Sequence, residues 1–469
     1  MPAPRQSLPA APADAFARLR DDLGLPDGFP VEVEAAADEA ATAGPRGDRV
    51  DATDLPLVTI DPPGSRDLDQ ALFIERRGSG GLRAHYAIAD LAAFVAVGDP
   101  IDREARERGR TVYLPDGTVP LHPRVLSEEA ASLLPGVERP ALLWRVDVDA
   151  DGVVVDSDLR RATVRSREKL DYVAAQHATA QPDHPAAGLL ELGRRRQELE
   201  WARGGISLDI ADQRVDLVDG VPELHLRRTL AIEAANAQLS LLVGQVAAQT
   251  MVDAGVGLLR TLPPSTEEQR AALRADAHAL GAPWPEHVDV ATFLRTLHGS
   301  SARDAALLVA ATRTLRGAGY QHLVPGEDPQ VHAAVAAHYA HVTAPLRRLV
   351  DRYAHEVLLA VTAGHDVPDD VAAILPTIPG QMQSGGSRAG AAERATTDLA
   401  EAILLSDRVG DTLRAVPLRH VAEDRTQVRL IDPAALLTVD ERLPLGTEVA
   451  VEVTAVDVVD RRVDLRPAT

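Results

Sequence analysis

The hydrophobic pattern of this chain changes twice, and those changes constrain its fold more than any other feature. Between residues 51 and 155 apolar residues occur in short, strand-like runs, and from 226 to 406 they recur at three- and four-residue spacing. From 427 to 465 the short runs return. Strands and helices that occupy separate stretches predict an α+β protein: a mixed sheet packed by long helices, followed by a small C-terminal β-barrel of the oligonucleotide-binding kind.

Local patterns and turn residues set the expected elements. Strands are predicted at 57–60, 71–75, 84–89, 142–148, 153–155, 427–431, 448–456 and 462–465. Helices are predicted at 14–25, 35–43, 99–109, 226–251, 266–280, 302–315, 330–363 and 388–406. We therefore expect a helical extension and linker over 1–48, a large unit of strands and long helices over 49–410 and a small β domain over 411–469.

Composition excludes several classes of protein. The chain has no cysteine, so disulfides, thiol nucleophiles and cysteine-ligated metal centres are ruled out. Lys169 is the single lysine among 49 basic residues, and it does not lie in a phosphate-binding Gly-Lys-Ser/Thr loop. No apolar run is long enough for a membrane span and no secretory signal is visible, so we expect a soluble cytoplasmic protein without a membrane partner.

The net charge of −21 argues against a protein that coats nucleic acid over its whole surface. It does not exclude a local basic channel, because binding follows the local field and not the total charge.

The acidic loop (61–70) is the strongest candidate for chemistry. Asp61, Asp67 and Asp69 fall within nine residues, and an extended backbone would place Asp67 and Asp69 on one face. Such carboxylates suit Mg²⁺ with substrate phosphate and water completing the shell, and a pair of such ions cleaves phosphodiesters. The alternative is an acidic loop that is simply solvated.

Two further segments carry weaker indications. In the arginine segment (343–348), Arg347 and Arg348 follow Pro345 and could hold a phosphate, or could pair with acids such as Asp351. Tyr113 lies beside a strand end in a chain with 3% aromatic residues, so it is either a platform for base stacking or part of the core.

A histidine group at 332, 338, 341 and 355 offers a different reading. His338 and His341 would share one face of the predicted 330–363 helix, which makes a histidine-ligated metallohydrolase conceivable. Core or surface histidines are the alternative.

Six segments, taken in order, resemble the catalytic (RNB) domain of the ribonuclease II / ribonuclease R family. They are Asp61-x5-Asp67-x-Asp69, His85–Asp90, Arg108–Pro115 with Val119–Ser127, Arg203–Asp209, Thr343–Arg348, and Ala392-Glu393-Arg394. The resemblance extends from about residue 50 to about residue 410.

This resemblance implies a 3′-to-5′ exoribonuclease that hydrolyses single-stranded RNA to nucleoside 5′-monophosphates with Mg²⁺, or with Mn²⁺ in its place. By position, Asp61, Asp67, Asp69 and Gln70 would form the metal site, with Asp67 and Asp69 also catalytic. Arg347 would contact the scissile phosphate, with Arg348 as the competing assignment. Tyr113 would stack on the terminal base, and Glu393 and Glu233 would contact the terminal nucleotides.

The sequence departs from the family pattern at several places. Gln70 stands where a fourth aspartate is usual, so one cation site loses a negative ligand, and catalysis would be weakened or lost. Leu349 replaces an aromatic residue and Glu356 replaces an arginine. An alternative function is therefore an RNA-binding protein of this fold with weakened catalysis.

The segment before residue 49 is too short for the cold-shock barrels usual in the family, so we expect a compact form without them. The C-terminal segment would be a reduced S1-type barrel, and we expect a monomer.

Overall fold

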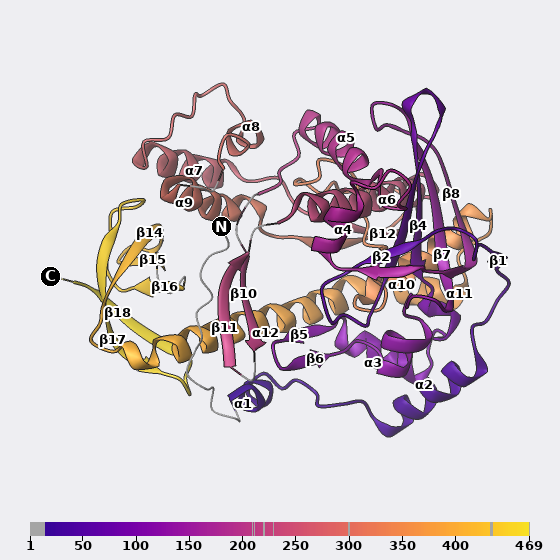
Figure 1. The fold of residues 1–469 in the computed structure, drawn as a ribbon, viewed down its shortest axis with the longest axis horizontal. Coiled ribbons are helices and arrows are strands. Elements are labelled where there is room, and N and C mark those ends of the chain that lie inside the picture. Colours follow the sequence, from indigo (N-terminus) through magenta and orange to yellow (C-terminus); the bar gives the residue numbers. More distant parts are fainter. Residues whose placement is uncertain are drawn as a thin grey trace.

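The computed structural model describes residues 15–208, 210, 212–218, 221–227, 229–298, 301–431 and 435–468 (Figure 1). Residues 1–14 of the expected N-terminal extension lie outside this range. So does Asp209, the last residue of the segment 203–209 that carries part of the family resemblance.

A seven-stranded mixed sheet forms the centre of the described part of the larger unit, in the order β1-β8-β7-β4-β3-β2-β9. Two of its pairings, β1 with β8 and β2 with β9, are parallel, and the others are antiparallel. Its strands are β1 (Val50–Asp51), β2 (Val58–Ile60), β3 (Gln70–Arg76), β4 (Leu82–Ala89), β7 (Glu138–Val148), β8 (Val154–Arg165) and β9 (Glu168–Leu170).

Some helices cover the two sides of this sheet, and others lie away from it, toward the C-terminal end of the chain (Figure 1). They are α1 (Ala15–Asp22), α2 (Val31–Ala43), α3 (Pro100–Arg108), α4 (Tyr172–Ala178), α5 (Leu189–Ala202), α6 (Ala231–Ala254), α7 (Glu267–Ala279), α8 (Val290–Leu294), α9 (Ala302–Ala311), α10 (Leu349–Thr362), α11 (Asp369–Ile374) and α12 (Ile378–Leu405). Within the described residues, every helix is too short or too polar to traverse a bilayer.

Alternation along the strands divides the core into two halves. Leu72, Tyr86 and Trp144 point to the face that packs on α6 and α10. Ala87 and Leu143 belong to the opposite face, which packs on α2 and on the loops that flank the sheet. Successive side chains of β3 therefore face opposite halves of the core. The same alternation sets the direction of the side chains where the acidic loop enters β3.

Helix α3 illustrates how local sequence sets an element. Asp99 caps its N-terminus by accepting a hydrogen bond of 2.7 Å from the Asp102 N–H, and Pro100 occupies the first turn. Gly109 ends the helix at φ +72°, where a Cβ would lie 2.7 Å from the Gln381 carbonyl oxygen and 3.2 Å from Gly385 Cα. Glycine is thus required both for the turn and for the close contact with α12.

Two expected helices are wrong in part. The helix predicted over 330–363 begins only at Leu349, because residues 330–348 form bridges and turns that pair with other elements. The helix predicted from Leu226 begins at Ala231, and Leu226 lies in a hairpin of β10 (Asp212–Val218) and β11 (Val221–Arg227). In both places tertiary pairing overrides a helical apolar spacing.

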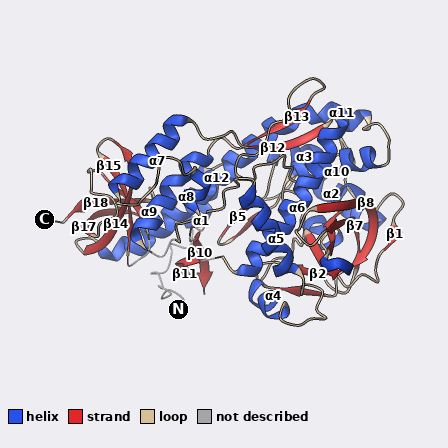
Figure 2. Cartoon of the chain, turned by 90° about the horizontal axis from the view of Figure 1, so that it is seen from above, coloured by secondary structure: helices blue, strands red, loops and turns tan. Residues whose placement is uncertain are grey.

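The predicted C-terminal barrel is confirmed. β14 (Thr412–Ala422), β15 (Arg425–Leu430), β16 (Leu436–Val439), β18 (Arg462–Pro467) and β17 (Val449–Asp457) close in that order into a ring. Helix α12 runs from beside the sheet to this barrel, as Figures 1 and 2 show. Its last turn contributes Leu405 to the barrel core.

The remaining described strands form three two-stranded pairs. One is the β10–β11 hairpin, and the others are β5 (Val112–Leu114) with β6 (Gly117–Val119) and β12 (Gly257–Thr261) with β13 (Gly319–Leu323). The pairs β5–β6 and β12–β13 each contribute residues to a cavity described below.

Candidate active site

The acidic loop connects β2 to β3 and is anchored at both ends. The Asp61 N–H donates to the Leu170 carbonyl at the end of β9, 3.0 Å away. The Leu68 N–H donates to Ser132 Oγ at 3.0 Å. These bonds fix the backbone on either side of the three aspartates, so the carboxylates project from a held loop.

Asp69 joins this loop to the arginine segment. Its side chain is buried, and its Oδ1 accepts a hydrogen bond of 2.8 Å from the Leu346 N–H. Its Oδ2 lies 3.1 Å from Arg347 Nε, while the Arg347 side chain remains 46% exposed. Asp69 therefore holds the Arg347 guanidinium through its Nε, while the rest of the side chain remains accessible to a substrate.

Helix α10 fixes the arginine segment from below. Asp351 in its first turn accepts a hydrogen bond from the Ala344 N–H at 2.7 Å and binds Arg348 at 2.9 and 2.8 Å. His355 Nε2 lies 2.6 Å from the Val342 carbonyl oxygen. Arg348 is thus engaged by Asp351, which leaves Arg347 as the guanidinium that faces the acidic loop.

Tyr113 on β5 lies across from the same loop. Its hydroxyl donates to Asp67 Oδ2 at 2.7 Å, yet the residue is 48% exposed. A cavity of about 300 Å³ opens between Asp67, Tyr113 and Leu346. An aromatic ring tethered at its hydroxyl and open on its surface is suited to stacking on a base.

Burial shifts the titration of two carboxyls in this cluster. Desolvation raises the pKa of Asp61 from 3.8 to about 6, with Arg347 opposing the shift and Asp67 adding to it. Desolvation likewise raises the pKa of Asp69 from 3.8 to about 8, again against the attraction of Arg347. A further positive charge, such as a bound cation, would lower both pKa values and favour the ionised carboxylates.

The Gln70 side chain points to a different side of the backbone from that of Asp69. As the first residue of β3 it shares the face of Leu72, and its Nε2 donates to the Thr343 carbonyl at 2.6 Å. Its Oε1 accepts a hydrogen bond from the buried Tyr86 hydroxyl, which also lies 2.8 Å from Ser240 Oγ on α6. The amide thus links the acidic loop, the arginine segment and α6, which is a structural use that the sequence did not indicate.

The two glutamates predicted to bind RNA lie on helices α6 and α12. Glu233 is in the first turn of α6, where it accepts hydrogen bonds from the Leu230 N–H at 3.0 Å and from Arg227. It lies near Tyr172, whose pKa is raised by desolvation and also by the charges of Asp61 and Glu233. Glu393 is exposed on α12, next to Ala392, which packs with Val112 and Leu114 of β5.

The histidines do not form the site that their spacing suggested. His338 and His341 lie in irregular backbone and share no helix face, so that part of the reading is wrong. His341 Nδ1 lies 2.7 Å from the Tyr320 hydroxyl, and its ring packs edge-on against Tyr320 and Tyr339. His355 serves the arginine segment as described above.

The residues that depart from the family pattern have local explanations. Leu349 is buried in the core on the α10 side of the sheet. Glu356 pairs with Arg161 of β8 at 2.8 Å. Tyr86, Ser240 and the Leu346 N–H were missed by sequence reasoning, because their role comes from contacts across the sheet and not from any local pattern.

The donors fit a hard cation in part. Asp61 Oδ2 and Asp69 Oδ2 are buried oxygens that accept no hydrogen bond from the described residues, and oxygen is the ligand that Mg²⁺ prefers. Within the described ranges, however, no three His, Cys, Asp or Glu side chains converge closely enough to hold a metal ion by themselves. The arrangement suits an ion that completes its shell with water and substrate phosphate.

The chain belongs to the RNB family: residues 49–364 match the RNB domain, and residues 411–468 match the RNase II-type exonuclease C-terminal S1 domain. These matches confirm the resemblance seen in the sequence and the S1-like nature of the barrel.

Individual relatives are consistent with this family membership. Exoribonuclease 2 of Klebsiella pneumoniae subsp. pneumoniae is 28% identical over 441 residues, and ribonuclease R of Escherichia coli is 28% identical over 417 residues. These alignments cover 90% and 81% of this chain, but it spans only 66% and 49% of the relatives' lengths. The Mycoplasma genitalium RNase R structure, in complex with ribose methylated single-stranded RNA, superimposes with a TM-score of 0.86 at 19% identity, over 97% of this chain and 78% of that one.

The raised pKa of Asp69 generates a test that does not depend on activity. A folded-state pKa above 3.8 means that ionisation favours unfolding, so stability is lost as the pH rises from about 4 to about 8. We expect metal-free Asp69→Asn protein to melt a few degrees above wild type at pH 8 and at about the same temperature at pH 4.

Adding Mg²⁺ at pH 8 should raise the melting temperature of the wild type and leave that of Asp69→Asn nearly unchanged. Scanning calorimetry with and without EDTA measures both effects. Equal Mg²⁺ shifts in the two proteins would show that Asp69 does not contribute to a metal site.

Proposed function

We propose that this protein is a 3′-to-5′ exoribonuclease that hydrolyses single-stranded RNA to nucleoside 5′-monophosphates. The observation that carries the proposal is the grouping of Asp61, Asp67 and Asp69 with the half-exposed Arg347 and Tyr113, next to a cavity that Asp67 and Tyr113 line. Membership of the RNB family, whose matched relatives are named as exoribonucleases, supports the same reaction.

The chain's own residues would divide the work between binding and charge stabilisation. Tyr113 stacks on the terminal base, and its hydroxyl keeps Asp67 in place through the 2.7 Å hydrogen bond. Arg347 binds the scissile phosphate and offsets the charge that develops there in the transition state. The buried Asp69 aims Arg347 and fixes the Leu346 backbone at once.

Asp61, Asp67 and Asp69 would hold the divalent cation, Mg²⁺ or Mn²⁺ in its place. When bound, such an ion supplies a nucleophilic water at neutral pH and polarises the phosphate. Gln70, whose amide is engaged by Thr343 and Tyr86, would support this set from behind without adding charge.

The catalytic unit that we propose covers residues 49–410, with the extension 1–48 before it and the S1-like barrel 411–469 after it. In this arrangement Glu393 and Glu233 would contact the terminal nucleotides. Arg348 would act on the arginine segment through Asp351.

A second candidate function is RNA binding with weakened catalysis. Gln70 favours it, because the amide provides no negative charge where the family usually places an aspartate, and its hydrogen bonds keep it occupied.

The first test is digestion of a 5′-labelled single-stranded RNA by the purified full chain with Mg²⁺, Mn²⁺ or EDTA. We expect a metal-dependent ladder that shortens from the 3′ end, and a loss of roughly 10²-fold or more in rate for Asp69→Asn or Arg347→Ala. The exposed Asp54→Asn is the matched control and should keep the wild-type rate. Wild-type cleavage by Asp69→Asn would exclude this mechanism.

Tyr113 allows stacking to be separated from hydrogen bonding. Tyr113→Phe keeps the ring and loses the bond to Asp67, whereas Tyr113→Ala loses both. We expect Tyr113→Ala to weaken RNA binding by roughly tenfold or more, and Tyr113→Phe to weaken it much less. Fluorescence anisotropy with labelled RNA in EDTA measures this difference, and equal losses would show that stacking is not the role of the ring.

Gln70→Asp separates the two candidate functions. An aspartate there cannot donate to the Thr343 carbonyl, so an active wild type should gain no rate from the change. Gln70→Asn, which keeps an uncharged amide on a shorter side chain, is the control for length. A rise from near-zero RNA hydrolysis in Gln70→Asp alone would favour the weakened RNA-binding protein.

A further inference from the structure

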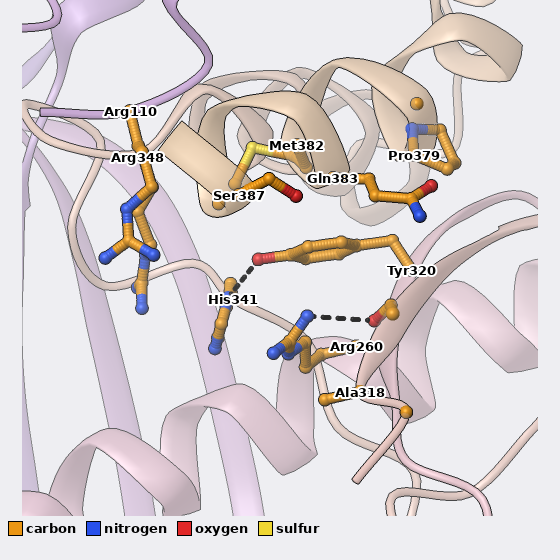
Figure 3. A pocket seen from close by; sticks show the side chains of 14 residues that line it. Arg110, Arg260, Ala318, Tyr320, His341, Arg348, Pro379, Met382, Gln383 and Ser387 are labelled. Atoms are coloured by element: carbon orange, nitrogen blue, oxygen red, sulfur yellow. Dashed lines mark hydrogen bonds between the residues drawn. The ribbon is translucent and has the colours of Figure 1, made fainter. Parts of the chain in front are cut away.

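A second cavity, of about 710 Å³, lies on the far side of the arginine segment from the acidic loop. We call it the arginine cavity; its side-chain lining includes Arg110, Arg260, Tyr320, His341 and Arg348. Figure 3 shows Arg110 and Arg348 side by side at one end, Tyr320 across the middle, and the first turns of α12 as the opposite wall.

The backbone explains why this cavity is separate from the acidic cluster. Arg110 and Arg348 form a β-bridge, and the Thr111 N–H donates to the Arg347 carbonyl at 3.0 Å. Arg347 lies in the turn directly before this bridge, and its side chain reaches Asp69. Thr111 lines the cavity beside Asp67 and Tyr113, whereas Arg348 and Arg110 line the arginine cavity.

The charge of the cavity is one-sided. None of the described residues that line it is an aspartate or a glutamate. Asp351 balances Arg348 from behind, but within the described part of the chain neither Arg110 nor Arg260 has an acidic ion-pair partner. The Arg110 Nε is buried, and no described residue accepts its hydrogen bond.

This imbalance is notable because acids outnumber bases, 70 to 49, over the whole sequence. Two guanidinium groups that face a common space without a counter-ion favour an anionic ligand, and the planar guanidinium suits phosphate oxygens.

The remaining wall suits the rest of a nucleotide. The Arg260 guanidinium lies 4.7 Å from the centre of the Tyr320 ring and donates to the Gly319 carbonyl at 3.2 Å. The Tyr320 hydroxyl contacts His341 Nδ1 at 2.7 Å. Burial, with the charges of Arg348, Arg260, His332 and Arg110, lowers the pKa of His341, which therefore adds a neutral polar group to the wall.

The first turns of α12 close the cavity across Tyr320 from Arg260, with Pro379, Gly380 and Gln383 in its lining (Figure 3). The helix is 28 residues long, and its N-terminal end carries the positive end of its dipole. A volume of several hundred Å³ lined by aromatic and convergent polar groups matches a small-molecule site.

We propose that the arginine cavity binds a phosphate monoester of nucleotide size, at a place distinct from the acidic cluster. Arg110 and Arg260 bind the phosphate, and Tyr320, His341 and Gln383 contact the nucleoside. The choice of a nucleoside 5′-monophosphate as ligand rests on the proposed function, since that is the product class of the proposed reaction.

Calorimetric titration of the full chain with adenosine 5′-monophosphate, in EDTA so that no cation bridges the ligand to the aspartates, tests the proposal. We expect one binding site, no binding of adenosine, and binding of inorganic phosphate that is weaker than that of the nucleotide. Arg260→Gln should weaken binding roughly tenfold or more, because it removes a charged donor. Arg110→Gln should weaken binding to the same extent, and it replaces Arg260→Gln in the test if that variant is too unstable to measure.

Two controls separate this cavity from the proposed active site. Arg414→Gln removes an exposed arginine of the barrel and should bind as wild type does. Asp69→Asn should also keep nucleotide binding while losing RNA hydrolysis. RNA left intact by a wild type that binds the nucleotide would refute the proposed function and leave this site standing.

The inference is overturned if wild type binds neither the nucleotide nor phosphate in EDTA. It is also overturned if Tyr113→Ala abolishes nucleotide binding while Arg260→Gln and Arg110→Gln leave it unchanged, since the ligand would then occupy the acidic cluster. Equal affinity for phosphate and nucleotide would contradict the role of Tyr320 and His341.

Discussion

The hydrogen bond between the Asp69 carboxylate and the Leu346 N–H is the contact on which the site depends. It joins residues 277 positions apart, and the same buried carboxylate holds Arg347. Asp351 performs the matching task from α10, since it binds the Ala344 N–H and Arg348 together. Asp69 and Asp351 thus accept hydrogen bonds from two backbone N–H groups of the arginine segment that no helix satisfies. These bonds hold the irregular backbone in place, and with it the Arg347 guanidinium.

One consequence of this arrangement is that neighbouring arginines have different surroundings. Arg347 is half-exposed beside the acidic loop, whereas Arg348 is bound by Asp351 and lines the arginine cavity. The sequence left the choice between them open. The turn at 345–347 and the bridge at Arg348 decide it, because they direct Arg347 toward Asp69 and Arg348 toward Asp351. At the start of β3, alternation along the strand separates Asp69 from Gln70 and directs the amide toward Tyr86 and α6.

The acidic loop and the arginine cavity each concentrate charge of one sign, which the net charge of the chain does not reveal. In the acidic loop, burial raises the pKa of Asp61 and Asp69, so the loop gains from a cation. In the arginine cavity, cations face one another with little compensation. A protein with a net charge of −21 can therefore hold an anion locally, because a buried site responds to the groups within a few ångströms of it.

The sequence by itself determined the division into strand-rich and helical stretches, the capped start of α3 at Asp99, the C-terminal barrel and the family, since each rests on local periodicity or on ordered motifs. It also identified Asp61, Asp67, Asp69 and Arg347 as candidates. Only the tertiary structure decided that residues 330–348 are not helical, that Gln70 is bound by Thr343 and Tyr86, and that Arg110 meets Arg260 across a cavity. These features arise from contacts between distant segments, and such contacts leave no periodic trace in a single sequence.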